Sequence, residues 1–221
     1  MVYARCTIDV HNFVLLQAIT LRPGYTSRNF YMHKKIAIFA SGSGSNAENI
    51  IRYFKGSGSV EVSLILTNNP SAGVIERGKR LDVPVVVFSR NNFSQTDAVV
   101  RLLQNNGTDW VILAGFLWLV PENLIRAFPG RIINIHPALL PEYGGKGMWG
   151  HHVHEAVVRN GESRSGITIH YVNEHYDEGE IIFQAQCEVL PTDTADAVAQ
   201  KVHELEYRHF PEVIETEILK S

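Results

Sequence analysis

The sequence predicts an α/β fold built on an open, mostly parallel twisted sheet with helices on both faces. Short apolar runs alternate with segments of helical spacing from Lys35 to Pro141. A glycine-rich loop follows the first apolar run, and two β-branched runs with a long helical segment close the chain. Alternation of strands and helices is typical of parallel sheets, so a C-terminal hairpin and helix would complete a single domain.

The first half supplies most of the alternation. Apolar runs predict strands over residues 35–40, 60–68, 83–89, 109–116 and 131–137, the last continuing into a proline-bounded loop up to 141. Helical spacing predicts helices over residues 46–55, 71–82, 94–106 and 121–128.

The second half has a different order. Residues 151–161 predict a helix that ends at Gly161. The β-branched runs 165–173 and 180–190 predict two strands that pair as a hairpin with a long loop. Residues 193–219 predict a helix that is interrupted near Pro211.

Composition excludes several classes of function. The formal net charge is -3 and no long basic stripe is present, which argues against a nucleic-acid partner. No apolar run approaches the roughly 18 residues of a membrane helix. Cys6 and Cys187 are far apart and lack metal-ligand spacing, so we expect no metal and a reducing, cytoplasmic environment.

Residues 1–31 differ from the rest of the chain. They lack the pattern of a secretory signal, and Met32 directly precedes the first strand. We expect residues 1–31 to be an extension, disordered or absent from the native protein, which the intact mass of that protein would test. Residues 32–221 would form the single domain.

The loop Ser41-Gly42-Ser43-Gly44-Ser45-Asn46 lies between the first strand and the first helix. Small residues at a helix start let backbone N–H groups approach an anion, which favours phosphate binding. The alternative is a tight turn in which Ser45 or Asn46 caps the helix. The second strand lacks the terminal acid that holds the ribose of NAD, so a monophosphate is the better ligand.

Asn134 and His136 end the fifth strand and lie on the same side of it. Ligands bind at the carboxyl ends of strands in open parallel sheets. An amide donor can stabilise a developing oxyanion, and an imidazole can donate a hydrogen bond or move a proton. The alternative for His136 is a buried histidine that is satisfied by the backbone.

Several motifs in this order resemble the phosphoribosylglycinamide formyltransferase family. They are Gly42–Asn46, LAGF at 113–116, Asn134–Pro141, Asp177 in HYDEGEII, and HELEYRHFP at 203–211. The resemblance covers residues 35–219 and implies a Rossmann-like formyltransferase fold. It also implies transfer of a formyl group from 10-formyltetrahydrofolate to the amine of 5′-phosphoribosylglycinamide in purine biosynthesis.

The resemblance implies roles for particular residues. Asn134 and His136 would stabilise the tetrahedral intermediate, and Asp177 would hold the charged form of His136. The substrate phosphate would bind to Gly44, Ser45 and Asn46, and the rest of that substrate to Glu206. The folate would contact Leu117, Trp118, Leu119, Val120 and Asn134. Residues 32–133 would thus form a phosphate-binding half, and 134–221 a folate and catalytic half.

The chain departs from the family pattern in places. Trp118 and Thr96 stand where a familiar member has arginines that contact the folate. The loop that leads into the helix at 151 is longer and rich in glycine, which suggests a mobile lid. His151 and His154 could share a helical face, but no third metal ligand is evident.

Other functions remain open at this stage. A formyltetrahydrofolate hydrolase, a methionyl-tRNA formyltransferase and a sugar-nucleotide formyltransferase share the catalytic chemistry, although the first two require further domains. A non-catalytic nucleotide-binding module would use the glycine loop but would not explain Asn134, His136 and Asp177. We expect small-molecule substrates as partners, no membrane, and a monomer or weak homodimer.

Overall fold

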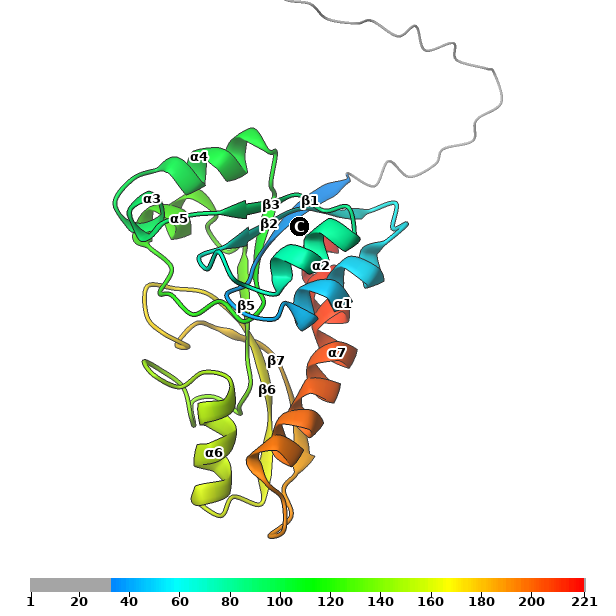
Figure 1. Ribbon diagram of the computed structural model, residues 1–221, viewed down its shortest axis with the longest axis vertical. Helices are drawn as coiled ribbons and strands as arrows, with labels where there is room; N and C mark the ends of the chain where they lie inside the picture. Colours follow the sequence, from blue (N-terminus) through cyan, green and yellow to red (C-terminus); the bar gives the residue numbers. More distant parts are fainter. Residues whose placement is uncertain (1–32, 221) are drawn as a thin grey trace, which may run out of the picture. The chain divides into compact units, whose positions relative to one another are not determined.

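The computed structural model describes residues 33–220, and its elements alternate along the chain as predicted (Figure 1). The strands are β1 Lys34–Phe39, β2 Val60–Thr67, β3 Val85–Val87, β4 Trp110–Leu113, β5 Ile132–His136, β6 Arg164–Tyr171 and β7 Ile181–Glu188. The helices are α1 Ser45–Phe54, α2 Val74–Arg80, α3 Arg90–Ser94, α4 Ala98–Asn105, α5 Glu122–Ala127, α6 His151–Arg159 and α7 Ala195–Leu219. The predicted extension, residues 1–31, lies outside the described residues, as does Met32.

A single sheet orders the strands β3-β2-β1-β4-β5-β6-β7. Neighbours from β3 to β5 pair in parallel, whereas β6 is antiparallel to both β5 and β7. This confirms the open, mostly parallel sheet with a C-terminal hairpin. The chain adds strands on one side of β1 and then crosses to β4 on the other, so a crevice forms at the carboxyl ends of β1 and β4.

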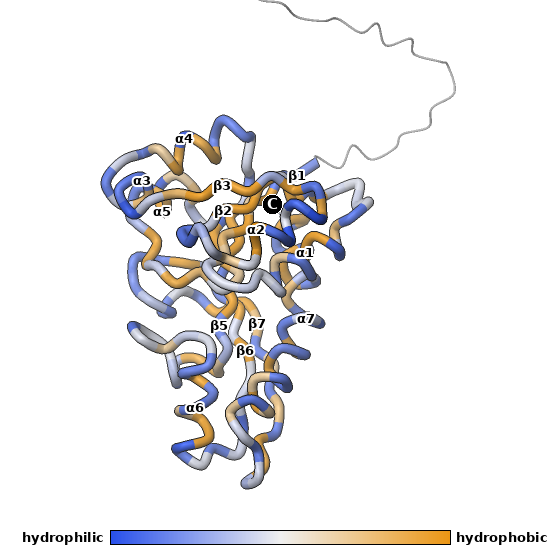
Figure 2. Tube along the Cα trace, viewed as in Figure 1, coloured by the Kyte–Doolittle hydropathy of each residue, from blue (hydrophilic) through white to orange (hydrophobic). Residues whose placement is uncertain are grey.

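Two apolar layers cover the two faces of the sheet. Alternation along β1 sends Ile36 and Ile38 into one layer and Ala37 and Phe39 into the other. Side chains of α1, α2, α6 and α7 pack in the first layer, and those of α3, α4 and α5 pack in the second. Figure 2 shows the apolar runs following the strands. The helices on both faces confirm the predicted layers.

The predicted interruption near Pro211 is wrong, because α7 continues through this residue. Proline lacks the N–H that would bond to the carbonyl oxygen of Tyr207, four residues earlier. Asn49 Nδ2 of α1 donates to that oxygen at 2.9 Å. The contact with α1 therefore satisfies the acceptor that proline leaves unpaired, and Pro211 itself is buried.

The predicted helix over residues 94–106 corresponds to α4, which is shorter, and the short helix α3 that precedes it was not predicted. Ser89 caps α3, since its Oγ accepts a hydrogen bond from the N–H of Asn92 at 3.2 Å. Among the helices of residues 33–220, none combines the length and the apolar content needed to cross a membrane.

Candidate active site

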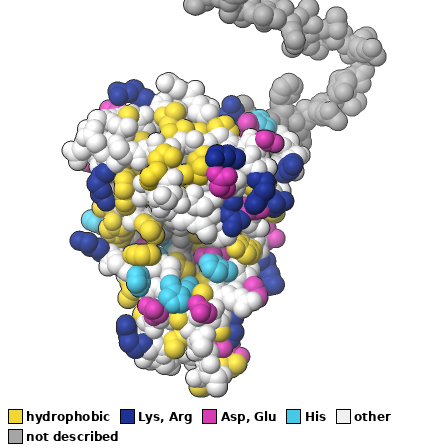
Figure 3. Space-filling view, in the orientation of Figure 1, with side chains coloured by type: hydrophobic (Ala, Val, Ile, Leu, Met, Phe, Trp, Pro, Cys, Tyr) yellow, Lys and Arg dark blue, Asp and Glu magenta, His cyan; other side chains and the backbone are white. Residues whose placement is uncertain are grey.

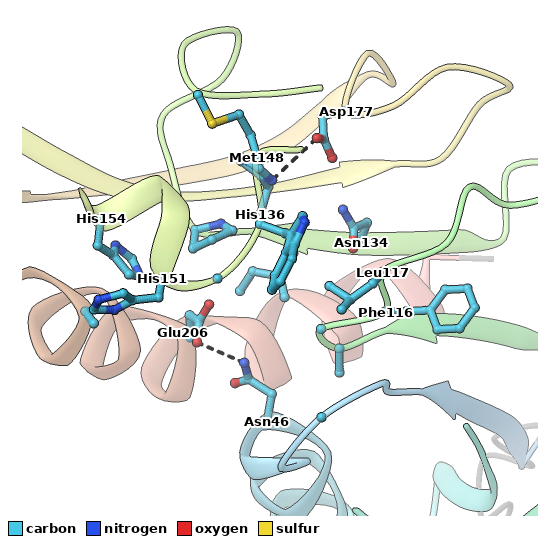
Figure 4. A pocket seen from close by; sticks show the side chains of 18 of the residues that line it. Asn46, Phe116, Leu117, Asn134, His136, Met148, His151, His154, Asp177 and Glu206 are labelled. Atoms are coloured by element: carbon cyan, nitrogen blue, oxygen red, sulfur yellow. Dashed lines mark hydrogen bonds and ion pairs between the residues drawn. The ribbon is translucent and has the colours of Figure 1, made fainter. Parts of the chain in front are cut away.

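A cavity of about 620 Å³ opens at the carboxyl ends of β1, β4 and β5 (Figure 4). Its volume suits small-molecule ligands. The predicted residues that line it are Gly44, Ser45, Asn46, Leu117, Asn134, His136, Asp177 and Glu206. Both predicted halves of the domain therefore contribute to one cavity. Trp118, Leu119 and Val120 are outside its lining, so their contact with folate stays a prediction.

Asn134 is oriented by a histidine that sequence reasoning missed. His170 lies opposite Asn134 where β6 pairs with β5. Nδ1 of His170 is 2.7 Å from the carbonyl oxygen of Tyr171, which can only accept, so Nδ1 carries the proton. Nε2 of His170 then accepts a hydrogen bond from Asn134 Nδ2 at 3.0 Å. The second N–H of the Asn134 amide is left to donate into the cavity.

His136 is almost fully buried, and both of its ring nitrogens have a neighbour. Nε2 is 2.7 Å from the carbonyl oxygen of Tyr143, so this nitrogen carries a proton. Nδ1 is 3.6 Å from Oδ2 of Asp177. In a neutral His136, the Nδ1 lone pair thus points toward the side of the ring where Asp177 lies. If Nδ1 gained a proton, the charged imidazole would form an ion pair with the Asp177 carboxylate.

Asp177 has a left-handed backbone with φ of 57° and reaches several groups at once. Its Oδ2 accepts from the N–H of Gly145 at 2.9 Å, and its Oδ1 is 3.7 Å from Nε2 of His170. The carboxylate therefore lies between the two imidazoles of His136 and His170.

Burial and neighbouring groups set the charges of His136 and Asp177. Burial lowers the pKa of His136, and this is partly offset by the Asp177 carboxylate and the Tyr143 carbonyl. Burial by itself raises the pKa of Asp177, but the nearby imidazoles of His170 and His136 and the hydrogen bond from the Gly145 N–H hold that pKa below its usual value. The resting site is therefore a neutral imidazole beside an ionised carboxylate.

The glycine loop begins α1 as predicted, but its side chains do not cap the helix. The N-cap residue is Gly44, whose φ is 75°. A larger residue would not fit at this position, because its Cβ would lie 2.5 Å from the Cβ of Val74. Ser45 and Asn46 form the first turn, where backbone N–H groups have no intrahelical partner. This geometry suits an anion at the mouth of the cavity.

Glu206 joins the glycine loop to α7. Its Oε2 accepts from Asn46 Nδ2 at 2.9 Å and from His203 Nδ1 at 2.7 Å (Figure 4). The hydrogen bond to Glu206 raises the pKa of His203 against the opposing effect of burial. His203, which sequence reasoning also missed, is thus favoured in its protonated form beside Glu206 and the glycine loop. Figure 3 shows histidine and acidic side chains gathered between α6 and α7.

The segment after β4 forms another wall of the cavity. Ser41 Oγ accepts from the N–H of Leu117 at 3.1 Å, which fixes this wall to the glycine loop. Leu117 is 41% exposed and faces the cavity. Trp118 turns instead to an aromatic cluster with Phe88, Phe93 and Phe116, and the Arg90 guanidinium lies 4.3 Å from the centre of its ring.

His154 of α6 is 2% exposed and lines the same cavity, and its Nδ1 has no hydrogen-bond partner among the described residues. His151 is exposed and pairs at 3.5 Å with Glu155 and at 3.7 Å with Asp196. Within residues 33–220 no group of three or more His, Cys, Asp or Glu residues is arranged to hold a metal ion. His151 also lines the cavity, so the structure brings the two histidines to one site but, among the described residues, gives them no third metal ligand.

His154 is expected to weaken the fold in acid. Burial, followed by the neighbouring His203, lowers the pKa of His154 to about 4. The unfolded chain, with a pKa near 6.5, then binds the proton more readily, so stability is lost as pH falls from about 6.5 to about 4. The full loss is about 3 kcal/mol. Urea unfolding of the wild type and His154→Gln across this range should show a flatter pH dependence for the variant. Parallel curves would contradict this expectation.

Comparison with known proteins agrees with the geometry. The family described as Formyl transferase matches residues 34–214. Phosphoribosylglycinamide formyltransferase, chloroplastic, from Arabidopsis thaliana is 42% identical over 187 residues, or 82% of this chain and 64% of the relative. Phosphoribosylglycinamide formyltransferase from Bacillus subtilis is 36% identical over 186 residues, or 82% of this chain and 93% of the relative.

A solved structure is also similar. The crystal structure of phosphoribosylglycinamide formyltransferase from Bacillus halodurans matches with a TM-score of 0.75 and 39% identity. The match covers 83% of this chain and 94% of that one. By contrast, the chain spans less than two thirds of the length of the Arabidopsis relative.

Proposed function

The chain belongs to the formyl transferase family, and from this premise we propose that it transfers the formyl group of 10-formyltetrahydrofolate to the amine of 5′-phosphoribosylglycinamide, a step of de novo purine biosynthesis. One observation carries the proposal. Asn134, His136 and Asp177 line the same cavity as the anion-binding start of α1. A formyl acceptor that bears a phosphate would use both parts of this cavity.

The proposed reaction begins when the substrate amine attacks the formyl carbon and the formyl oxygen gains negative charge. Asn134 Nδ2 has one N–H engaged with His170, and its other N–H donates to that oxygen. The rigid bond to His170 holds the amide in place before the charge develops. The backbone N–H groups of Ser45 and Asn46 hold the phosphate, while the folate rests against Leu117. Its contact with residues 118–120 stays a prediction, because these residues are outside the cavity lining.

His136 would move the proton. Its Nε2 proton is engaged with Tyr143, so Nδ1 accepts the proton that the attacking amine loses. The resulting imidazolium is balanced by Asp177, 3.6 Å away. The bond between the formyl carbon and N10 of the folate then breaks, N10 takes the proton, and the products are tetrahydrofolate and the formylated amine.

The same reading extends to the setting of the enzyme. We propose that it acts in the cytoplasm on small-molecule substrates, without a metal, as a monomer or weak homodimer. We assign phosphate binding mainly to residues 32–133, and folate binding and catalysis mainly to residues 134–221. The two ranges overlap in these roles at the cavity, because Leu117, proposed to contact the folate, belongs to the first range and Glu206, proposed to bind the phosphorylated substrate, to the second.

The test is a spectrophotometric assay with 10-formyl-5,8-dideazafolate, run with and without phosphoribosylglycinamide. We expect deformylation only when the amine is present. Deformylation without the amine would instead identify a hydrolase, for which the anion-binding loop and Glu206 would have no purpose. Absence of reaction in both cases would overturn the proposed acceptor.

A further inference from the structure

Two of the proposed catalytic groups are held by the backbone of one short loop. The carbonyl oxygen of Tyr143 accepts from His136 Nε2 at 2.7 Å, and the N–H of Gly145 donates to Asp177 Oδ2 at 2.9 Å. These contacts fix which nitrogen of His136 carries its proton and where the carboxylate stands. The position of the loop backbone therefore matters to the proton transfer.

Tyr143 has a backbone conformation that requires support. Its φ is 55°, in the left-handed region that residues with a side chain rarely adopt. Such conformations persist where the surrounding structure holds them in place. The left-handed conformation of Tyr143 therefore requires contacts that hold the residue in this position.

The side chain of Tyr143 supplies such contacts. Its hydroxyl donates to Glu162 Oε1 at 2.6 Å and accepts from Asn160 Nδ2 at 3.0 Å. Both partners follow the end of α6 at Arg159. The ring packs beside the apolar layer on the same face of the sheet as α6 and α7. The loop that carries the Tyr143 carbonyl is thus tied to the end of a helix.

We propose that Tyr143 is a positioning residue for proton transfer: its hydroxyl, anchored on Glu162 and Asn160, places its own carbonyl oxygen so that His136 keeps Nδ1 directed at the reacting groups. Neither Tyr143 nor Glu162 is among the residues that line the cavity, so neither is assigned a contact with substrate. The inference rests on the proposed function, because its kinetic readout is formyl transfer.

The charged surroundings of His136 allow a clean test. The titratable groups that influence it are Asp177 on the loop before β7, His170 on β6, and Glu206 and His154 on the two flanking helices. Tyr143→Phe removes one hydroxyl and changes none of these charges. A changed pH profile in that variant would therefore report the position of the Tyr143 carbonyl.

The decisive variant is Tyr143→Phe. We expect kcat to fall about tenfold, as for a displaced catalytic group, with both KM values within about twofold of wild type. The Tyr143 carbonyl favours the protonated ring, so its displacement should move the acid limb of the kcat profile to lower pH. Glu162→Leu should reproduce these changes, whereas Glu162→Gln keeps an acceptor and should stay close to wild type.

A matched control is Tyr53→Phe. Its hydroxyl also donates to a glutamate at 2.6 Å, Glu215, but it lies between α1 and α7 and outside the cavity lining. This variant should retain kcat and the pH profile. Equal losses in the two variants would indicate a general effect on the fold and would overturn the proposal.

A second readout does not depend on the reaction. In ¹⁵N-histidine NMR, with the His136 signals identified by their loss in His136→Ala, the neutral wild type should show the Nε2–H tautomer. Tyr143→Phe should shift the His136 titration, and Tyr53→Phe should not. Unchanged His136 signals and unchanged kcat in Tyr143→Phe would overturn the inference. A wild type with the expected His136 signals but no formyl transfer would overturn the proposed function alone.

Discussion

His136→Ala is expected to lower kcat by about 10³-fold while the folded state persists. The substitution removes the one group whose Nδ1 can accept the amine proton next to the Asp177 carboxylate. General base catalysis contributes roughly 10²–10⁴ in rate, which sets the size of the loss. Because Asn134 and the anion-binding loop remain, the KM for the phosphorylated amine should change far less than kcat.

The matched control is His175→Ala, which removes an exposed histidine that does not line the cavity. Steady-state kinetics of both variants with both substrates would measure the change in kcat and KM, and circular dichroism would confirm that both variants are folded. His175→Ala should match the wild type. Turnover near the wild-type value in His136→Ala would remove this residue from the mechanism, whatever its position in the cavity.

The same assignment predicts the wild-type pH profile. The proposed base must be neutral, so kcat/KM should rise with pH through the pKa of His136 in the free enzyme. Burial lowers that pKa below 6.5, so the acid limb should lie below this value.

The layered fold could be predicted because its strands are buried on both faces. Such strands read as short apolar runs, and β1, β2 and β4 all fall within the predicted ranges extended by one residue. The continuity of α7 at Pro211 could not be predicted in the same way. It depends on Asn49, which is distant in sequence and is brought to Tyr207 only by the packing of α1 on α7.

In the candidate site, too, some residues could be placed from the local sequence, whereas others depend on tertiary structure. Asn134 and His136 lie at the end of β5, and the glycine loop follows β1, so their place at the carboxyl ends of the sheet is a local property of the sequence. The role of His170 depends instead on the register between β5 and β6, which sets it opposite Asn134. A shift of one residue would turn His170 to the other face of the sheet.

His203 and Tyr143 were missed for a related reason. The three-residue spacing of His203 and Glu206 would allow contact on a helix, but only tertiary structure brings both to Asn46. Tyr143 acts on His136 through a backbone carbonyl, and side-chain patterns carry no signal for such a contact. Sequence reasoning therefore found the reacting groups better than the groups that hold them.

Glu206→Gln is expected to raise the KM for phosphoribosylglycinamide about 10- to 100-fold and to leave the KM for the folate unchanged. Both internal contacts of Glu206, to Asn46 and His203, use Oε2, which the amide oxygen of glutamine can replace. The other carboxylate oxygen becomes an NH₂ group, so hydroxyl donors of the substrate lose an acceptor. Hydrogen bonds to charged groups contribute roughly 1.5–3 kcal/mol, which gives this range.

The split between the two KM values is what makes this variant informative. Glu206 is 5% exposed and lies next to the glycine loop, whereas the predicted folate wall begins at Leu117. The matched control is Glu215→Gln, because Glu215 also lies on α7 and accepts one side-chain hydrogen bond, from Tyr53, outside the cavity lining. A rise in the folate KM alone would reverse the two subsites, because the carboxylate would then face the folate.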